Sequence, residues 1–196
     1  MSSDIEVDSR SFVMGALAGT ATWIVGYALT ALVVLARIEG SELGEISGNV
    51  ESGGTIDFVG WVFFNSHFVD TVIEAGFLGF GGTRSVSYVG GDGFTPLLYV
   101  VPVALLVTAG VFVGRSSGVT DTAEGAVAGA LAAPAYLTLS AVGAVVFRVS
   151  SEALGATFSG RPELVPAIVL AGIVFPVVFG SLGGVVAANT GAGGGQ

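Results

Sequence analysis

The stretch LVPAIVLAGIVFPVVFGSLGGVVAA, residues 164–188, runs for 25 residues without a charged side chain. About 20 apolar residues in a helix cross the ~30 Å hydrocarbon core of a bilayer, so this segment is long enough to span a membrane. Three further uncharged runs are as long or nearly so: 12–36, 95–114 and 125–147. Four such helices in one chain of 196 residues would leave no polar shell, so the sequence predicts a membrane protein.

The composition supports this class. Apolar residues make up 52% of the chain, charged residues 11%, and the mean hydropathy is +0.85, whereas soluble domains carry about 25% charged residues. We therefore predict an all-α membrane protein with four transmembrane helices, arranged as two helical hairpins in a single membrane domain over residues 1–196. The glycine-rich residues 189–196 are expected to form a flexible tail.

The one long connection, residues 37–94, carries eight acids and the two bases Arg37 and Arg84. Within it, a helix over residues 61–75 would place aromatic and branched side chains on one face and polar ones on the other. This pattern predicts an interfacial amphipathic helix. A fifth span is disfavoured, because Asp70 and Glu74 would each cost about 2.5–3.5 kcal/mol near its centre. Downstream, the alternation in RSVSYV and the turn signal GGDG predict a short hairpin.

The amphipathic segment includes the only histidine of the chain. On a helix His67, Asp70 and Glu74 would project from one side, where they could bind a divalent cation or act as an acid–base cluster. Such sites usually draw ligands from several helices, so these residues are weak candidates. A solvated polar face is the preferred interpretation. We predict no metal site, no catalytic residue and no cofactor.

Every predicted span contains two small residues four positions apart. Such steps let helix backbones approach closely in lipid, where van der Waals contact drives association. Chance is the alternative, since the chain holds 32 glycines. The predicted helix-packing positions are Gly15, Gly19, Gly110, Gly114, Gly125, Gly129, Gly180 and Gly184.

Two prolines lie near the middle of the third and fourth spans. Pro134 and Pro176 remove backbone donors, so each is expected to kink its helix. A kink could open a cavity lined by nearby hydroxyls such as Tyr136 and Thr138. The simpler interpretation is that these hydroxyls bond back to the freed carbonyl groups.

The two halves of the chain show faint similarity. GALAGTATW from Gly15 resembles GALAAPAYL from Gly129, and Pro102 and Gly110 share their spacing with Pro176 and Gly184. The first pair of segments is separated by more residues than the second pair, and an insertion in the first helical hairpin would account for the difference. Two parallel hairpins of this kind occur in transporters built from parallel repeats. A shared bias toward Gly, Ala, Leu and Val explains the same similarity without duplication.

The charge balance excludes one class of partner. Fifteen acids against six bases give a net charge of −9, which disfavours nucleic acid, since phosphate binding needs clustered cations. Lysine and cysteine are both absent, so disulfides and thiolate metal sites are excluded. An acidic, lysine-free chain rich in Gly, Ala and Val resembles the small integral membrane proteins of halophilic archaea. The pattern WVFFNSHFVD, followed by a glycine-rich loop and TPLLYVVP, is similar to an uncharacterised family of such proteins, which implies no activity.

Orientation rests on opposing signals. Arg10 and Arg115 lie in segments on the same side as the termini, whereas the other four arginines lie in connections on the opposite side. The positive-inside rule therefore favours external termini. A long acidic loop is better suited to the outside of the cell. We therefore predict a protein of the cell membrane whose termini are cytoplasmic.

The spans lack ionisable residues, which argues against a proton-coupled pump, a voltage sensor and intramembrane acid–base catalysis. We expect a non-enzymatic multi-pass protein and keep two hypotheses. One is a small transporter-like permease component, with the kinked third and fourth spans lining a path. The alternative is a non-transporting scaffold or partner subunit that packs against other membrane helices. The predicted partners are the lipid bilayer and either another membrane protein or further copies of the chain.

Overall fold

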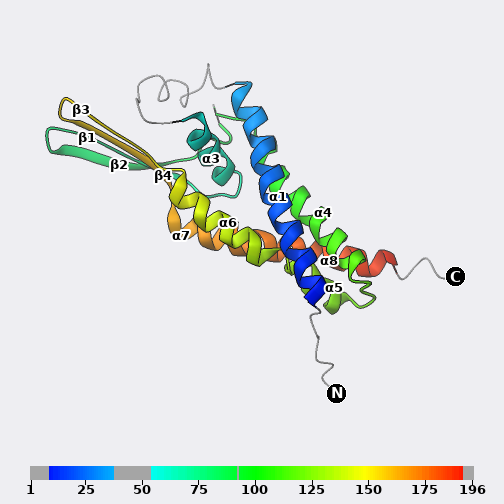
Figure 1. Cartoon of the computed structure of the whole chain (residues 1–196). Helices are drawn as coiled ribbons and strands as arrows, with labels where there is room; N and C mark the ends of the chain where they lie inside the picture. Colours follow the sequence, from blue (N-terminus) through cyan, green and yellow to red (C-terminus); the bar gives the residue numbers. More distant parts are fainter. Residues whose placement is uncertain (1–8, 38–53, 92, 192–196) are drawn as a thin grey trace. The chain divides into compact units, whose positions relative to one another are not determined.

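The computed structural model describes residues 9–37, 54–91 and 93–191 (Figure 1). Residues 38–53 of the predicted acidic loop, residue 92, and residues 192–196 of the predicted tail lie outside the described part. The chain divides into two compact units. The first unit contains residues 1–24, 102–139 and 172–196, and the second contains residues 25–101 and 140–171.

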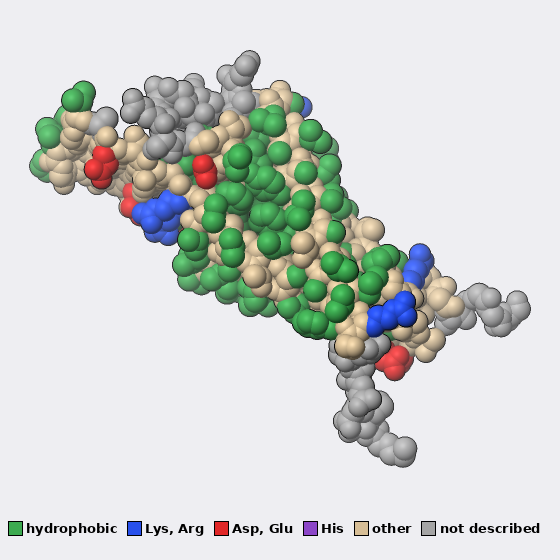
Figure 2. Space-filling view, in the orientation of Figure 1, with side chains coloured by type: hydrophobic (Ala, Val, Ile, Leu, Met, Phe, Trp, Pro, Cys, Tyr) green, Lys and Arg blue, Asp and Glu red, His purple; other side chains and the backbone are tan. Residues whose placement is uncertain are grey.

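Four helical segments are long and apolar enough to cross a membrane, as the sequence predicts: Ser9–Leu35, Pro96–Ser116, Thr122–Val146 and Leu164–Gly191. Large hydrophobic side chains on these helices, such as Leu17 and Leu32, are exposed, and Figure 2 shows hydrophobic side chains covering much of one face. Exposed apolar helix surfaces of this kind suit a lipid environment. Residues 189–191, predicted to belong to the flexible tail, are helical instead.

The first two segments are simple. The first is a single helix, α1 (Ser9–Leu35). The second begins with a short 3₁₀ turn, η2 (Pro96–Tyr99), and continues as α4 (Val100–Ser116). The Thr95 side chain accepts a hydrogen bond from the Leu97 backbone N–H at 3.4 Å, which is how a threonine caps a helix start.

The third and fourth segments are interrupted. The third consists of α5 (Thr122–Ala130) and α6 (Ala133–Val146), separated by a two-residue turn. The fourth consists of α7 (Leu164–Pro166), a π-helix η3 (Ala167–Val174) and α8 (Phe175–Gly191). Pro134 lies in the first turn of α6, where a missing N–H removes no helical hydrogen bond. Pro176 is the second residue of α8, which directly follows the π-helix η3 within one continuous helical segment, so its missing N–H leaves a gap in the helical hydrogen bonds there.

The segment predicted as an amphipathic helix over residues 61–75 folds differently. Helix α3 runs from Thr55 to Asn65, and strand β1 (Thr71–Phe77) follows after a turn. The turn contains Phe68 with a φ of +59°, which no α-helix accommodates. β-Branched residues at the start of β1 favour an extended chain. The prediction of a helix here is therefore wrong, and the class is helices plus one sheet.

The sheet has four antiparallel strands in the order β2-β1-β4-β3. Strand β2 (Phe80–Val86) pairs with β1, while β3 (Val149–Ala153) and β4 (Ala156–Pro162) form a second hairpin. The two hairpins lie side by side because β1 pairs with β4, with Thr71 opposite Pro162 (Figure 1). The hairpin in this connection differs from the predicted one: it pairs Thr71–Phe77 with Phe80–Val86 and turns at Leu78–Gly79, whereas GGDG lies beyond its second strand.

Candidate functional site

The base of the sheet packs on the buried residues of α3. The Trp61 indole N–H donates to the Phe147 carbonyl oxygen at 2.9 Å, and its ring meets that of Phe58 edge-on at a centroid distance of 4.9 Å. A Cβ added at Gly160 of β4 would collide with the Trp61 ring. The glycine therefore lets the sheet lie directly on the indole, and the WVFFNSH stretch is the core of the second unit.

Asn65 connects α3 to the chain on both sides of β1. Its buried amide nitrogen donates to the Val69 carbonyl oxygen at 2.7 Å and contacts the Thr71 hydroxyl at 3.4 Å. Its oxygen accepts from the Tyr88 backbone N–H at 2.8 Å. A side chain that both donates and accepts is needed here, since buried backbone groups left unpaired are costly.

His67 is fully buried, so its predicted place on a solvated polar face is wrong. Its Nδ1 lies 2.8 Å from the Phe63 carbonyl oxygen and 3.2 Å from the Ser66 hydroxyl. A carbonyl can only accept, so Nδ1 carries the proton. Burial lowers the pKa of His67 to about 4, because desolvation disfavours the charged imidazolium. The ring is neutral at physiological pH and acts as a structural donor.

The three weak metal candidates do not share a face. His67 lies in the turn after α3, Asp70 precedes β1, and Glu74 is exposed on β1. Among the residues that the structure describes, no group of three His, Asp or Glu side chains could hold a metal ion. The helical spacing that suggested a cluster disappears because the segment becomes a strand.

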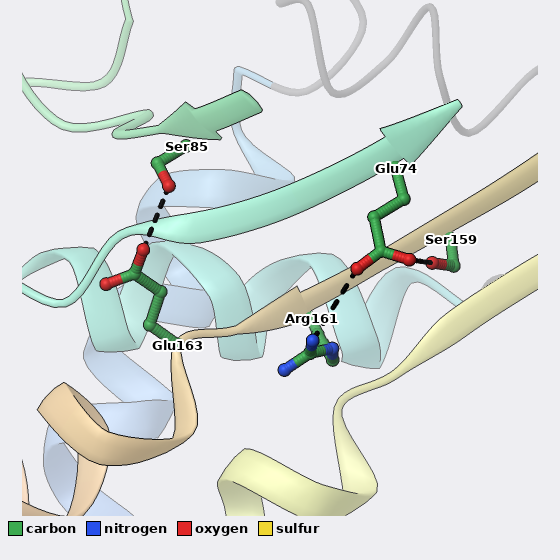
Figure 3. A network of polar contacts seen from close by, with 5 residues as sticks. All are labelled: Glu74, Ser85, Ser159, Arg161 and Glu163. Atoms are coloured by element: carbon green, nitrogen blue, oxygen red, sulfur yellow. Dashed lines mark hydrogen bonds and ion pairs between the residues drawn. The ribbon is translucent and has the colours of Figure 1, made fainter. Parts of the chain in front are cut away.

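One face of the sheet carries polar side chains instead. Alternation along the strands places Glu74, Ser159 and Arg161 on this face. The Arg161 guanidinium lies 3.6 Å from the Glu74 carboxylate, and the Ser159 hydroxyl donates to the same carboxylate at 3.4 Å (Figure 3). Both charged side chains are partly exposed, so this pair contributes about 1 kcal/mol at most.

A second contact connects the sheet to the start of the fourth segment. The Ser85 hydroxyl of β2 donates to the Glu163 carboxylate at 2.9 Å (Figure 3), and the Glu163 backbone N–H donates to the Asp70 carbonyl oxygen at 2.9 Å. Glu163 directly precedes α7. These contacts connect strand β2 and the turn before β1 to the residue that precedes α7.

The predicted glycine positions of the first unit lie at helix contacts. A Cβ at Gly110 of α4 or at Gly129 of α5 would collide with the Gly180 carbonyl oxygen of α8. Gly125 and Gly184 oppose each other in the same way. Gly114 lies against Ala187, and α1 packs through Gly15 on Leu131 and through Gly19 on Ala132. At Gly110, Gly125 and Gly129 backbone meets backbone without intervening side chains, as expected for small-residue packing in lipid.

The hydroxyls near the interruption of the third segment have structural partners. Thr138 donates to the Pro134 carbonyl oxygen at 2.9 Å, four residues earlier, which is the back-bonding pattern of helical threonines. Tyr136 is buried, with 1% of its surface exposed. Thr138 therefore bonds back within α6, in agreement with the simpler of the two interpretations.

Sequence reasoning missed the sheet. The available signals were two Leu-Gly pairs, Leu78–Gly79 and Leu154–Gly155, each between short alternating stretches. Neither pair is among the Asn-Gly or Asp-Gly dipeptides that mark two-residue hairpins most strongly. By sequence alone, the second hairpin therefore resembles an ordinary short loop between two spans.

Four apolar segments are long enough to span a membrane, and a small sheet is formed by the connections after the first and the third of them. These features indicate a membrane protein. Residues 2–191 match the model of a family of unknown function (DUF7978), and the chain belongs to this family. No curated protein and no solved structure matches the chain.

Proposed function

We propose that the protein is a non-transporting membrane scaffold or partner subunit without catalytic activity. Its helices pack against other membrane helices, and its sheet is held outside the bilayer as a docking element. The observation that carries this proposal is the meeting of Gly110, Gly129 and Gly180, where α4, α5 and α8 touch through their backbones. Helices in backbone contact at these glycines leave no room for water between them at these contacts.

A scaffold needs surfaces for its neighbours, and the apolar faces of the spans and the polar face of the sheet are such surfaces. Apolar side chains on the spans remain exposed, including Leu17, Leu32 and Val165. The sheet presents serine, threonine and charged side chains on one face. The acidic character of the chain suits a protein exposed to strong brine, where carboxylates repel one another less.

A second candidate is the permease component, which the interruptions of the third and fourth segments favour. Broken helices line substrate sites in many transporters, and π-helical turns are frequent at functional sites. In this case η3 and the turn between α5 and α6 would border the path.

Reconstitution separates the two candidates. The purified chain is placed in liposomes, and flux of ions and small solutes is measured at several salt concentrations against empty liposomes and against a known pore. We expect flux equal to that of empty liposomes. Flux above this background would contradict the scaffold proposal and favour the permease.

The scaffold proposal also requires a stable neighbour. Purification in mild detergent at high salt is expected to retain a membrane subunit in fixed stoichiometry, either another protein or further copies of the chain. A solitary chain under these conditions, and in native membranes after cross-linking, would contradict it.

A further inference from the structure

The two hairpins of the sheet are arranged in tandem. Strand β1 is antiparallel to both β2 and β4, and β3 is antiparallel to β4. Consequently β3 runs in the direction of β1, and β4 in the direction of β2. The second hairpin therefore has the orientation that the first hairpin would have if it were moved across the sheet by two strands. Both hairpins also turn through Leu-Gly, at Leu78–Gly79 and Leu154–Gly155.

The junction between the hairpins shows what the turn leucine does. The Leu78 backbone N–H donates to the Gly155 carbonyl oxygen at 2.9 Å, and the Leu78 side chain covers Gly155 so closely that a Cβ there would lie 2.9 Å from it. Beside this contact, Phe77 pairs with Ala156. Leu78 of the first hairpin thus contacts the turn of the second hairpin through both its backbone and its side chain.

Leu154 has the same backbone conformation without that contact. Leu78 and Leu154 both have a φ of +49°, a region that branched apolar residues rarely occupy and that asparagine or glycine occupies more cheaply. Yet 99% of the Leu154 surface is exposed. At the opposite edge of the sheet, 84% of Phe80 is exposed. Among the described residues, these are the two most exposed large hydrophobic side chains.

We propose that β3 of one molecule pairs with β2 of a second copy of this chain, repeating the internal junction between β1 and β4. Leu154 would then donate its N–H to Gly79 of the neighbour and cover that glycine, as Leu78 covers Gly155. Ala153 would lie opposite Phe80 of the neighbour. The partner is a second copy because each sheet has β2 at one edge and β3 at the other, so pairing β3 with β2 continues the same strand order from one copy to the next.

The register of this pairing can be checked against side-chain polarity. Transferring the internal register places Ser150 opposite Thr83 of the neighbour, polar beside polar, on the face that carries Glu74 and Ser159. A slip by one residue would place Glu152 opposite Phe80, since a one-residue shift exchanges the faces. The register that follows from the internal junction is thus also the one that matches polarity.

The β2 edge is exposed, and on the β3 edge Ser150 and Glu152 are exposed while Val149 is buried. All residues of β2 from Phe80 to Ser85 are exposed. The strand contains no proline and no lysine, and Arg84 is its one charged residue. Gly81 and Gly82 leave its outer side free of bulk. The contact joins two different edges, so copies follow one another head to tail and form a closed ring or an open row. The inference rests on the sheet and holds for either candidate function.

Disulfide trapping tests the pairing, because the chain has no cysteine of its own. The variant carrying both Ser150→Cys and Thr83→Cys is oxidised in native membranes and in mild detergent at high salt. Within one chain these positions lie on opposite edges, three strand spacings or about 14 Å apart, too far for a disulfide. We expect dimers and larger cross-linked species.

Three controls make the result specific. Each single variant, Ser150→Cys or Thr83→Cys, is expected to remain uncross-linked alone, and mixing the two is expected to give dimers only. The pair Thr83→Cys with Glu152→Cys is out of register and is expected to cross-link weakly. Cross-linking of a single variant as strong as that of the double variant would overturn head-to-tail pairing, as would a double variant that stays monomeric.

A second measurement does not depend on disulfide chemistry. Leu154→Asn should preserve or raise the melting temperature of the chain, because asparagine tolerates positive φ in a hairpin turn. It should nevertheless abolish the oligomers that native mass spectrometry detects for the unmodified chain. A Leu154→Asn protein that assembles like the unmodified chain, or an unmodified chain that is monomeric, would overturn the proposal.

Discussion

At the scale of single residues, the chemistry of the WVFFNSH stretch is decided by burial. Trp61, Asn65 and His67 are all within the core of the second unit. Each satisfies its polar atoms with backbone groups: the Phe147 carbonyl for Trp61, the Val69 carbonyl for Asn65 and the Phe63 carbonyl for His67. Polar side chains used in this way stabilise one arrangement of the chain, because misplacing them leaves buried groups unpaired.

Replacing Asn65 by alanine should strongly destabilise the second unit. The change leaves the Tyr88 N–H and the Val69 carbonyl without their present partner, which costs on the order of 2–4 kcal/mol. Thermal unfolding in detergent and high salt measures the effect. Asn189→Ala is the matched control, since Asn189 is exposed on α8, and it should shift stability by less than about 0.5 kcal/mol. Equal effects of the two variants would contradict the role of Asn65.

His67 should make the fold sensitive to acid. Its pKa is about 4 in the folded chain against 6.5 ordinarily, so the unfolded chain binds the proton more readily. The stabilisation is therefore complete above about pH 6.5 and is lost as the pH falls toward 4, by roughly 3 kcal/mol in total.

The comparison that isolates this effect is with His67→Gln, which cannot titrate. The difference in unfolding free energy between the two proteins should shrink as the pH is lowered from 7 to 4, while the carboxylates, present in both, cancel. A difference that stays constant over this range would show that His67 does not titrate as its burial requires.

At the scale of elements, helix contacts in the first unit depend on the absence of side chains. Gly184 of α8 and Gly125 of α5 oppose each other so closely that a methyl group on either meets the carbonyl oxygen of the other. Helices that meet through backbone atoms cannot relax around an added group without separating.

Gly184→Ala should accordingly weaken the packing of α8, although alanine is the better helix former. We expect a loss of about 1–3 kcal/mol, the usual cost of overpacking. Gly191→Ala, in the same helix with no atom within 4 Å of the new Cβ, should be neutral or slightly stabilising. Unfolding in mixed detergent micelles measures both variants, and a Gly184→Ala protein as stable as Gly191→Ala would contradict close packing at this seam.

At the scale of the whole molecule, the sheet constrains topology. The first hairpin lies between the first and second apolar segments, and the second hairpin lies between the third and fourth. Because β1 pairs with β4, both connections must be on the same side of any bilayer that the four segments cross. If each of the four segments crosses the bilayer once, we expect the connection between α4 and α5 on the opposite side.

Impermeant thiol labelling tests this topology. Thr83→Cys on β2 and Thr120→Cys between α4 and α5 are both exposed sites. With cytoplasmic termini, we expect intact cells to label Thr83→Cys, and Thr120→Cys only after permeabilisation. The reverse pattern would invert the orientation, and labelling of both from one side would contradict four crossings.

The apolar segments could be predicted from sequence because their length and lack of charge are local properties. The glycine positions follow from the same local pattern, and the structure places them at helix contacts. Residues 61–75 could not be predicted in this way. The heptad-like spacing of Trp61, Phe68 and Val72 fits a helix, but the turn at Phe68 and the pairing of β1 override it.

What the sequence by itself determined is the solvent that this protein suits, because four uncharged stretches are each long enough to cross a lipid bilayer. Only the tertiary structure decided that the histidine-bearing stretch forms a helix end, a turn and a strand, and that residues 149–162 form a second hairpin. Strand β1 finds its partner β4 about ninety residues away, with Thr71 opposite Pro162. Pairing between strands so far apart depends on where the intervening helices bring the chain, which no local pattern records.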